Sequence, residues 1–260
     1  MAEEIRLLPL GTGWSFAEEL YYTNLLLMVG ERFIFVDCPP YLFRMLREHR
    51  ERLGDERLRA ESYGEVIITH NHEDHVAGVE ELGYLSVRGR MPRPRLYGLP
   101  ATLEALWEGS LRAGLSLRVD AAGRPLPLGM EDYFEPVPIG ERNDMGGFIL
   151  ETRKTFHTPE TIALKFDFGG GRKLGYSCDT GFVPDLIEWL SECDFIMHEV
   201  NFRPDVPFHT PLDRLKELPE DLQRKIHLVH YSDDFRDHDP GAMRFLEQGR
   251  VYRLFEGDGG

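Results

Sequence analysis

The feature that most constrains this chain is a strand-like run that leads directly into three histidines and an aspartate. The apolar, β-branched stretch 66–69 is followed by His70, His72, Asp74 and His75. At the end of a strand, alternation places His70 and His72 on one side, and a loop turning into a helix brings Asp74 and His75 to the same point. Imidazole and carboxylate groups are ligands that zinc, iron and manganese accept. The clustering of histidines directly after a strand disfavours a chance arrangement in a polar loop and predicts a metal site.

Strand-like and helix-like patterns alternate along the whole chain. The predicted strands are 5–8, 25–29, 33–36, 66–69, 148–155, 162–168, 174–177, 195–198, 226–230 and 251–255. The predicted helices are 42–53, 101–117, 186–190, 212–225 with a break at Pro219, and 242–248. Gly169-Gly170-Gly171 predicts a hairpin turn between two of the strands. This mixture predicts an α/β or α+β fold.

Composition excludes several classes of protein. The 260 residues show no linker and no internal repeat, so we predict a single domain over 1–260. The formal charge of −15 opposes a polyanion, which disfavours nucleic acid as the main substrate. Cys38, Cys178 and Cys193 are an odd number, too few for a disulfide framework, and are predicted to be small buried residues. With no signal-peptide pattern from Met1 onwards and no membrane-length apolar run, we expect a soluble, cytoplasmic protein.

The run His70-Asn71-His72-Glu73-Asp74-His75 resembles the His-x-His-x-Asp-His motif of the metallo-β-lactamase superfamily, and the match is complete. Leu10-Gly11-Thr12-Gly13 is similar to the glycine-rich opening turn of the ribonuclease Z branch, and Phe35-Val36-Asp37-Cys38 to the superfamily's strand that ends in aspartate. The resemblance implies a four-layer αβ/βα sandwich with the metals at one edge of two β-sheets. It also implies a hydrolase.

Three residues further along match the remaining ligands of the resembled family. His157 matches the third histidine, Asp179 the bridging aspartate and His230 the last histidine, and each follows an apolar or alternating run. The resemblance implies that one metal is held by His70, His72 and His157, the other by Asp74, His75 and His230, and that Asp179 bridges them. It implies two divalent ions, zinc first and manganese or iron as alternatives, with a hydroxide between them that Asp74 orients.

A second group of residues resembles motifs of one particular branch of the superfamily. His198-Glu199 and the later His209-Thr210 resemble the His-Glu-Ala-Thr motif and the following His-x-Thr segment of ribonuclease Z-like phosphodiesterases, although Val200 and Asn201 replace Ala and Thr. The resemblance implies that Glu199 keeps His198 or His209 protonated, so that one of them acts as general acid. The alternative is that His198 and Glu199 form a structural hydrogen-bonded pair.

The leading hypothesis is metal-dependent hydrolysis of a small phosphodiester. His157 and Asp179 are 22 positions apart, which two strands and a turn fill, so no arm that grips transfer-RNA fits between them. The extra length lies instead between His75 and His157. Within it, the segment at about 84–140 includes the basic patch Arg88 to Arg95 and is predicted to cover the site, with the arginines as candidates for binding a substrate anion. Alternatives are a thioester, lactone or other ester hydrolase, a ribonuclease Z-type endonuclease, and a catalytically silent metal-binding scaffold. A homodimer is also expected from the resemblance.

Overall fold

Two seven-stranded β-sheets lie at the centre of the computed structural model, which describes residues 3–203 and 206–255. The first sheet has the order β16-β1-β2-β3-β4-β5-β8 and contains β1 (Ile5–Gly11), β2 (Asn24–Val29), β3 (Arg32–Val36), β4 (Glu65–Ile67), β5 (Arg95–Gly98), β8 (Glu135–Pro138) and β16 (Tyr252–Leu254). The second has the order β15-β14-β13-β12-β11-β10-β9 and contains β9 (Arg142–Asp144), β10 (Ile149–Lys154), β11 (Ile162–Asp167), β12 (Lys173–Tyr176), β13 (Phe195–Glu199), β14 (Ile226–Val229) and β15 (Arg244–Phe245).

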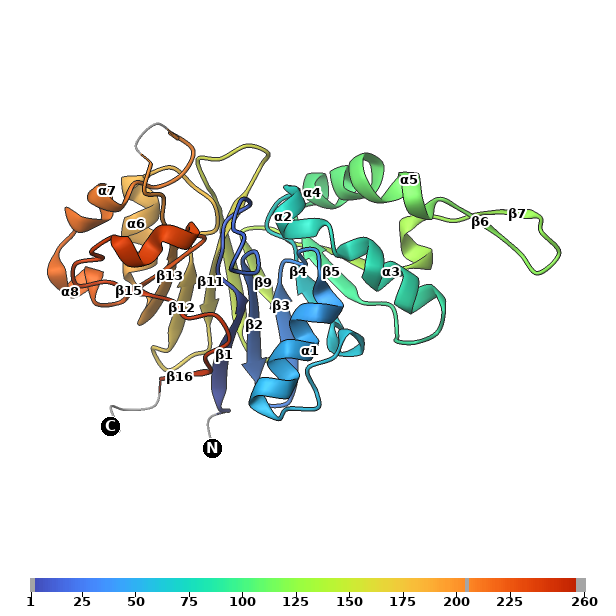
Figure 1. Cartoon of the computed structure of the whole chain (residues 1–260), viewed down its shortest axis with the longest axis horizontal. Coiled ribbons are helices and arrows are strands. Elements are labelled where there is room, and N and C mark those ends of the chain that lie inside the picture. The colour runs from blue at the N-terminus through green and yellow to red at the C-terminus, as the bar shows by residue number, and fades with distance from the viewer. Residues whose placement is uncertain (1–2, 204–205, 256–260) are drawn as a thin grey trace.

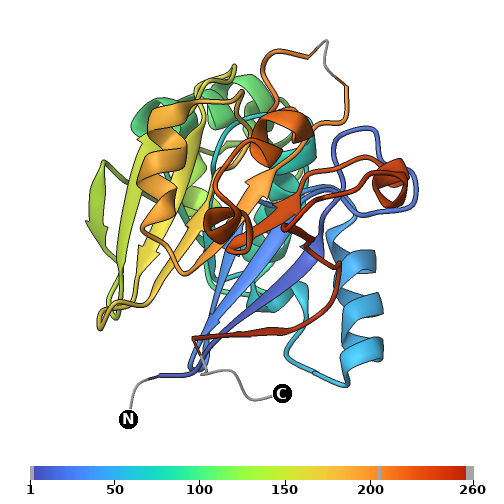
Figure 2. The ribbon, with the colours of Figure 1, turned by 90° about the vertical axis from the view of Figure 1, so that its left-hand side faces the viewer.

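Helices cover the outer face of each sheet, so the fold has four layers (Figure 1). Beside the first sheet lie α1 (Leu42–Leu53), α2 (Glu73–Val76), α3 (Val79–Val87), α4 (Pro100–Ala105) and α5 (Arg112–Leu115). Beside the second sheet lie α6 (Pro184–Ser191), α7 (Leu212–Lys216) and α8 (Glu220–Gln223), which Figure 2 shows in front of its strands. A π-helix (Leu106–Leu111) joins α4 to α5, and the 3₁₀ turns are η1 (Ala60–Ser62), η3 (Met130–Asp132) and η4 (Asp233–Asp237). The four-layer αβ/βα class predicted from the sequence is confirmed.

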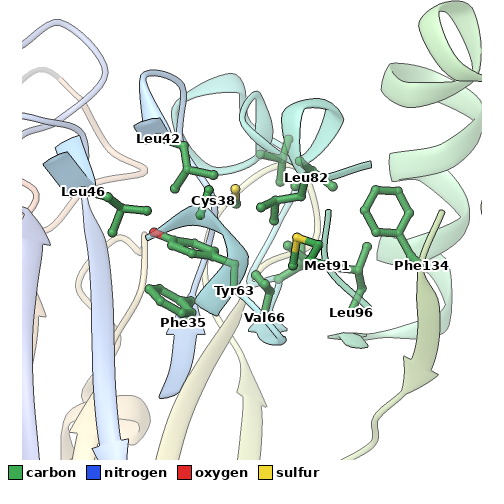
Figure 3. Close-up of a cluster of buried hydrophobic side chains, with 14 of the residues drawn as sticks. Phe35, Cys38, Leu42, Leu46, Tyr63, Val66, Leu82, Met91, Leu96 and Phe134 are labelled. Carbon is green, nitrogen blue, oxygen red and sulfur yellow. The ribbon is translucent and has the colours of Figure 1, made fainter. Parts of the chain in front are cut away.

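Three buried clusters of apolar side chains hold these layers together. The first fills the space between the first sheet and its helices, where Phe35 stacks on Tyr63 with ring centroids 3.3 Å apart (Figure 3). The second lies between the two sheets and includes Met197, and the third lies between the second sheet and α6 and α7 and includes Ile196. Because Ile196 and Met197 are neighbours on β13, the two faces of this strand serve different cores.

Helix α1 shows how the sequence fixes one of these elements. Leu42, Met45 and Leu46 are buried at helical spacing, which turns one face of the helix towards the first sheet. Gly54 ends the helix in the left-handed conformation, with φ of 65°, and its N–H donates to the Arg50 carbonyl at 2.8 Å. A glycine at this position avoids the steric cost that a Cβ would have there.

Most of the predicted elements are present, but one helix is wrong. Residues 242–248 were expected to be helical from their apolar spacing, whereas Arg244 and Phe245 form β15 and pair with β14. The helix predicted at 101–117 is helical from Pro100 to Leu115 in three segments, after which β6 (Leu117–Val119) pairs with β7 (Pro125–Pro127) in a separate hairpin. The predicted turn at 169–171 does join β11 to β12, which run antiparallel. Strands β5, β8 and β9 were not predicted.

The hairpin of β6 and β7 extends away from the rest of the molecule (Figure 1). It belongs to the segment at about 84–140, whose covering role stays a prediction, as does the single-domain assignment. The three cysteines are buried, as the sequence predicts. Within residues 3–203 and 206–255, no helix is long and apolar enough to cross a membrane. The N-terminal Met1 and Ala2 lie outside the described residues.

Candidate metal centre

The candidate ligands follow strands whose carboxyl ends meet at one edge of the sandwich. Strand β4 is parallel to β3 in the first sheet, and β12, β13 and β14 are parallel to one another in the second. His70 and His75 lie in the segment that follows β4, His157 follows β10, Asp179 follows β12 and His230 follows β14. The structure therefore brings together side chains that lie up to 160 positions apart in the sequence, from His70 to His230.

Three histidines form the first group of nitrogen atoms. The Nε2 atom of His70 lies 3.1 Å from Nδ1 of His72, and Nε2 of His157 lies 3.2 Å from the same Nδ1 atom. The Asp179 Oδ2 atom lies 3.8 Å from both Nε2 atoms. Four ligand atoms of these residues come within 4.8 Å of one another, an arrangement that suits a small divalent ion.

A second group shares Asp179 with the first. The Nε2 atom of His75 lies 3.5 Å from Asp74 Oδ2 and 3.6 Å from Asp179 Oδ1. The Nε2 atom of His230 lies 3.3 Å from Asp179 Oδ2 and 4.0 Å from Asp74 Oδ2. Among the described residues, His75 Nε2 and Asp179 Oδ1 are buried polar atoms without a hydrogen-bond partner. Because such atoms are costly to leave unsatisfied, their convergence indicates a position for a cation.

The buried carboxylate of Asp37 fixes the orientation of His75 directly and that of His70 through Thr69. Its Oδ2 atom lies 2.7 Å from His75 Nδ1, and its Oδ1 atom accepts the backbone N–H of Thr69 at 2.8 Å. The hydroxyl of Thr69 contacts both Asp37 oxygens and lies 3.1 Å from His70 Nδ1. Such partners set which nitrogen of each ring carries the proton and leave the other free to bind a metal.

Two further rings are held through the nitrogen that faces away from the cluster. The Nδ1 atom of His230 lies 3.2 Å from the Thr23 hydroxyl, and Nδ1 of His157 lies 3.1 Å from the Phe208 carbonyl oxygen. Sequence reasoning gave no role to Thr23, Thr69 or Phe208. No motif marks Thr23 or Phe208, because each contact joins segments far apart in the chain.

Burial keeps most of these histidines neutral, which is the form that binds metals. It lowers the pKa of four of them, that of His230 to about 4 and that of His70 well below the usual value; the others are His72 and His157. Burial also lowers the pKa of His75, but three neighbouring carboxylates, first that of Asp179, outweigh it and raise that pKa well above the usual value. Negative charge therefore gathers around His75, where a cation would be stabilised.

Three non-glycine residues at this edge adopt a positive φ. They are Asp37 at 66°, Cys178 at 50° and His230 at 60°, and each lies just beyond the end of its strand. Side chains rarely adopt this conformation, which costs about 1–3 kcal/mol per residue. Backbone strain therefore gathers at the candidate metal centre, where packing and hydrogen bonds hold it.

The structure separates the two histidines that the sequence left as alternative general acids. His209 Nδ1 lies 2.8 Å from Glu199 Oε2, and the His209 ring lies 5.1 Å from that of His157. His198 instead shares the strand face of Ile196, towards the third core cluster, and its Nδ1 lies 2.7 Å from the Glu199 backbone oxygen. Only 1% of His198 is exposed, and burial lowers its pKa to about 4.

The basic patch Arg88 to Arg95 lies away from these side chains. Arg95 pairs with Glu65 at the start of β5 and β4, five positions before His70 on the parallel strand. The Arg95 guanidinium lies 3.3 Å from Glu135, and that of Arg90 lies 3.0 Å from Glu61. Ion pairs at the opposite edge of the sheet, rather than the metal centre, occupy these two arginines.

Solved structures with the same fold cover nearly the whole chain. The chain is similar to the metallo-β-lactamase fold protein YhfI of Bacillus subtilis, with a TM-score of 0.72 and 18% identity over 96% of this chain and 99% of that chain. It is also similar to a diphosphatase of the PhnP family, with a TM-score of 0.70 and 17% identity over 96% and 98%, and to human short-form tRNase Z, with 0.66 and 18% over 96% and 99%. Fold and site together define the class: a protein of the metallo-β-lactamase fold with a candidate metal centre.

The chain belongs to the family described as anti-Pycsar protein Apyc1, whose sequence profile matches residues 5–252. The anti-Pycsar protein Apyc1 of Paenibacillus sp. (strain J14) is 32% identical over 257 residues, which cover 96% of this chain and 99% of that protein. The protein of the same name from Bacillus phage BSP38 is 29% identical and covers 94% of this chain and 96% of its own length.

Proposed function

We propose that the chain hydrolyses the phosphodiester bond of a small cyclic nucleotide at a centre for two divalent metal ions. The observation that carries this proposal is the convergence of seven His and Asp side chains at one edge of the two sheets. The choice of substrate is supported by the family, whose members degrade small cyclic nucleotide signals.

The side chains present fit two ions of the zinc, manganese or iron type. His70, His72 and His157 would hold one ion, and Asp74, His75 and His230 the other. Asp179 would bridge the two, because its oxygens face both groups at 3.3 to 3.8 Å. The unsatisfied His75 Nε2 and Asp179 Oδ1 atoms are the ones that a cation would satisfy. When bound, a pair of such ions supplies a nucleophile at neutral pH and stabilises negative charge on the phosphoryl oxygens.

Asp74 can orient the attacking oxygen and accept its proton. Its Oδ2 atom lies 3.5 Å from His75 and 4.0 Å from His230, so it borders the space in which the reaction would occur. The residue is 6% exposed, more than Asp179 at 1%, so its carboxylate is the more accessible of the two. Among the candidate ligands, Asp74 is thus the one that can both bind and exchange a proton.

His209 is the residue that we assign to protonation of the leaving oxygen. Burial lowers its pKa, but the Glu199 carboxylate at 2.8 Å outweighs burial and raises it, so the ring is protonated near neutral pH. Glu199 is fully buried and also accepts the Thr180 backbone N–H, so it holds the ring in place. With Nδ1 bonded to Glu199, the Nε2–H of His209 is free to donate to the substrate.

His198 has a structural role in this proposal. It lies on the opposite face of β13 from Glu199, and burial keeps it neutral. A neutral imidazole that faces a core cannot protonate a substrate at the metal edge. Of the two histidines that the sequence left open as general acid, the proposal therefore assigns His209, with Glu199 as its partner.

The connection between His157 and Asp179 argues against a ribonuclease Z-type activity. Strands β11 and β12 and the turn at 169–171 occupy this part of the chain and leave no inserted arm that could grip transfer-RNA. The formal charge of −15 adds a long-range repulsion of polyanions. Thioesters and lactones remain alternative substrates because the same ligand set could hydrolyse them, whereas a silent scaffold would be expected to have lost ligands.

Competition under one buffer tests this function. Metal-loaded protein is given nucleoside 3′,5′-cyclic monophosphates, a thioester, a lactone and a precursor transfer-RNA, each at equal concentration. We expect ring opening of the cyclic nucleotides to be fastest by kcat/KM. Specific cleavage of the precursor at its 3′ end, with cyclic nucleotides inert, would favour a ribonuclease Z-type endonuclease and contradict the proposed function. Fastest hydrolysis of the thioester or lactone would favour an ester hydrolase.

A further inference from the structure

Two exposed aromatic side chains, Phe156 and Phe208, contact each other beside the candidate metal centre. Their ring centroids are 5.6 Å apart with planes inclined by 36°, and 53% and 41% of these residues are exposed. We call them the aromatic pair. Exposed rings of this size are unfavourable in water, so a pair held next to a set of candidate ligands is a candidate surface for an apolar, planar ligand.

The aromatic pair is tied to two residues of the metal edge by chain connectivity and by a hydrogen bond. Phe156 directly precedes His157, and Phe208 directly precedes His209. The two segments meet where the His157 Nδ1 atom lies 3.1 Å from the Phe208 carbonyl oxygen. Each ring of the pair therefore belongs to the residue directly before His157 or His209.

A third segment, the one that carries Asp179, is hydrogen-bonded to the backbone of Phe156. The Phe156 carbonyl accepts the Gly181 N–H at 2.9 Å, and the Phe156 N–H donates to the Thr180 hydroxyl at 3.2 Å. A Cβ atom on Gly181 would lie 2.7 Å from Cδ1 of Phe156 and 2.5 Å from the Pro207 carbonyl oxygen. The absence of a side chain at Gly181 is thus what allows the Phe156 ring to rest there.

We propose that the aromatic pair is the subsite for the base of the nucleotide whose phosphodiester lies at the metal centre; this inference rests on the proposed function. In a cyclic nucleotide the base is one ribose away from the phosphorus. The two rings of the pair belong to the residues directly before His157 and His209 in the chain. Aromatic rings stack on any base because every base has a π-face. The pair would therefore select nucleotides over phosphodiesters without a base and discriminate little among bases.

A second pair of aromatic rings near the site is a weaker candidate. Trp14 and Phe16 lie 5.1 Å apart edge to face, and Phe16 is 74% exposed. The Trp14 backbone N–H donates to the carbonyl of Tyr231, which ties this pair to the segment after His230. The Arg203 guanidinium also lies 5.3 Å from the Trp14 ring, where it already occupies a face of the ring.

Steady-state kinetics with two substrates that differ only in the base test the proposal. The substrates are a nucleoside 3′,5′-cyclic monophosphate and 1-deoxyribose 3′,5′-cyclic phosphate, with ring opening followed by phosphorus NMR. For Phe156→Ala and Phe208→Ala we expect KM for the nucleotide to rise on the order of 10- to 100-fold, with kcat nearly unchanged. The substrate without a base should be unaffected, and Phe156→Trp should restore KM. Phe43→Ala, which removes a 49% exposed ring on α1, is the matched control.

Binding by the metal-free protein separates this inference from the proposed hydrolysis. Saturation-transfer NMR with a nucleoside 5′-monophosphate should show contact between the base and the protein that both alanine variants lose and Phe43→Ala keeps. Wild-type protein that hydrolyses neither substrate but keeps this contact would contradict only the proposed function. Equal losses on both substrates would assign the pair a structural role and overturn the inference. A loss of nucleotide binding that is confined to Phe16→Ala would also overturn the inference.

Discussion

Asp179 is the residue through which the two halves of the candidate metal centre depend on each other. Its Oδ2 atom lies 3.3 Å from His230 and 3.8 Å from His70, and its Oδ1 atom lies 3.6 Å from His75. Burial would raise its pKa, but the neighbouring imidazoles, His230 first, hold it well below the usual value. A buried, ionised carboxylate is costly unless positive charge compensates it, so this one favours bound cations strongly.

Removal of that carboxylate should therefore weaken both ion positions at once. We expect Asp179→Ala to lose most of its metal and all measurable turnover, because the remaining ligands of the two groups are histidine rings and one other aspartate. Elemental analysis after dialysis, with activity measured on the same sample, checks this. Asp185→Ala, an exposed carboxylate at the start of α6, is the control. An active variant with full metal content would show that Asp179 is not a metal ligand.

The leaving-group dependence of His209→Ala tests the assignment of the general acid. A general acid is typically worth about 10²–10⁴-fold in rate, so kcat on a cyclic nucleotide should fall by that order. The loss should be much smaller on bis(p-nitrophenyl) phosphate, whose leaving group needs no proton. His198→Ala is the contrasting variant and should lower the unfolding temperature more than the rate, because it empties a buried position.

Equal losses of His209→Ala on both substrates would contradict the acid role. A His198→Ala protein that behaves as described for His209→Ala would return the assignment to the alternative that the sequence left open.

The sequence revealed some of these residues and not others for a physical reason. His70 to His75 lie within one short segment, so their spacing alone indicates shared chemistry. Asp179 and His230 required the resemblance, because a lone residue at a strand end has many possible roles. Thr23 and Phe208 act through contacts between distant segments, which only the assembled sheets bring together.

At the scale of elements, most strands with apolar or alternating residues could be predicted, whereas the edge strands β8 and β9 could not. Strand β8 contains Pro136 and Pro138, which count against a strand in a sequence but are tolerated at the edge of a sheet. Strand β9 lies at the other sheet's edge and consists of polar residues. The segment 242–248 has a spacing that also suits a helix, and pairing of Arg244 and Phe245 with β14 overrides it.

The effect of an added methyl group at Gly78 and at Gly109 gives a prediction about stability at this scale. Gly78 joins α2 to α3, and a Cβ there would lie 2.2 Å from the Pro39 carbonyl oxygen, a backbone atom that no rotamer change can move. We expect Gly78→Ala to destabilise the fold by about 1–3 kcal/mol and to weaken metal binding, because α2 carries Asp74 and His75.

Gly109 is the matched control for this substitution. It lies inside the π-helix with nothing within 4 Å of a built Cβ, so Gly109→Ala should stabilise the protein by about 0.5–1 kcal/mol. Thermal denaturation of both variants checks the pair. Unchanged stability of Gly78→Ala would show that the junction of α2 and α3 shifts easily and does not fix the ligands.

At the scale of the whole molecule, the alternation of strands and helices predicts a mixed fold, whereas the four-layer arrangement came from the resemblance. The projecting hairpin of β6 and β7 had no signal in the sequence, since both strands are short and largely exposed and β7 contains two prolines. The homodimer expected from the resemblance stays a prediction that light scattering of the purified protein checks. The fold thus brings the candidate ligands together at one edge of the two sheets.

The central claim is that one chain holds two catalytic metal ions, and metal titration tests it most directly. Metal-free protein is titrated with zinc or manganese, and bound metal per chain is measured by elemental analysis alongside hydrolysis of a cyclic nucleotide. We predict that binding saturates at two ions per chain and that activity reaches its maximum only as the second ion binds, because the proposed hydrolysis needs both ions. Saturation at one ion per chain with full activity, even in excess metal, would contradict the account.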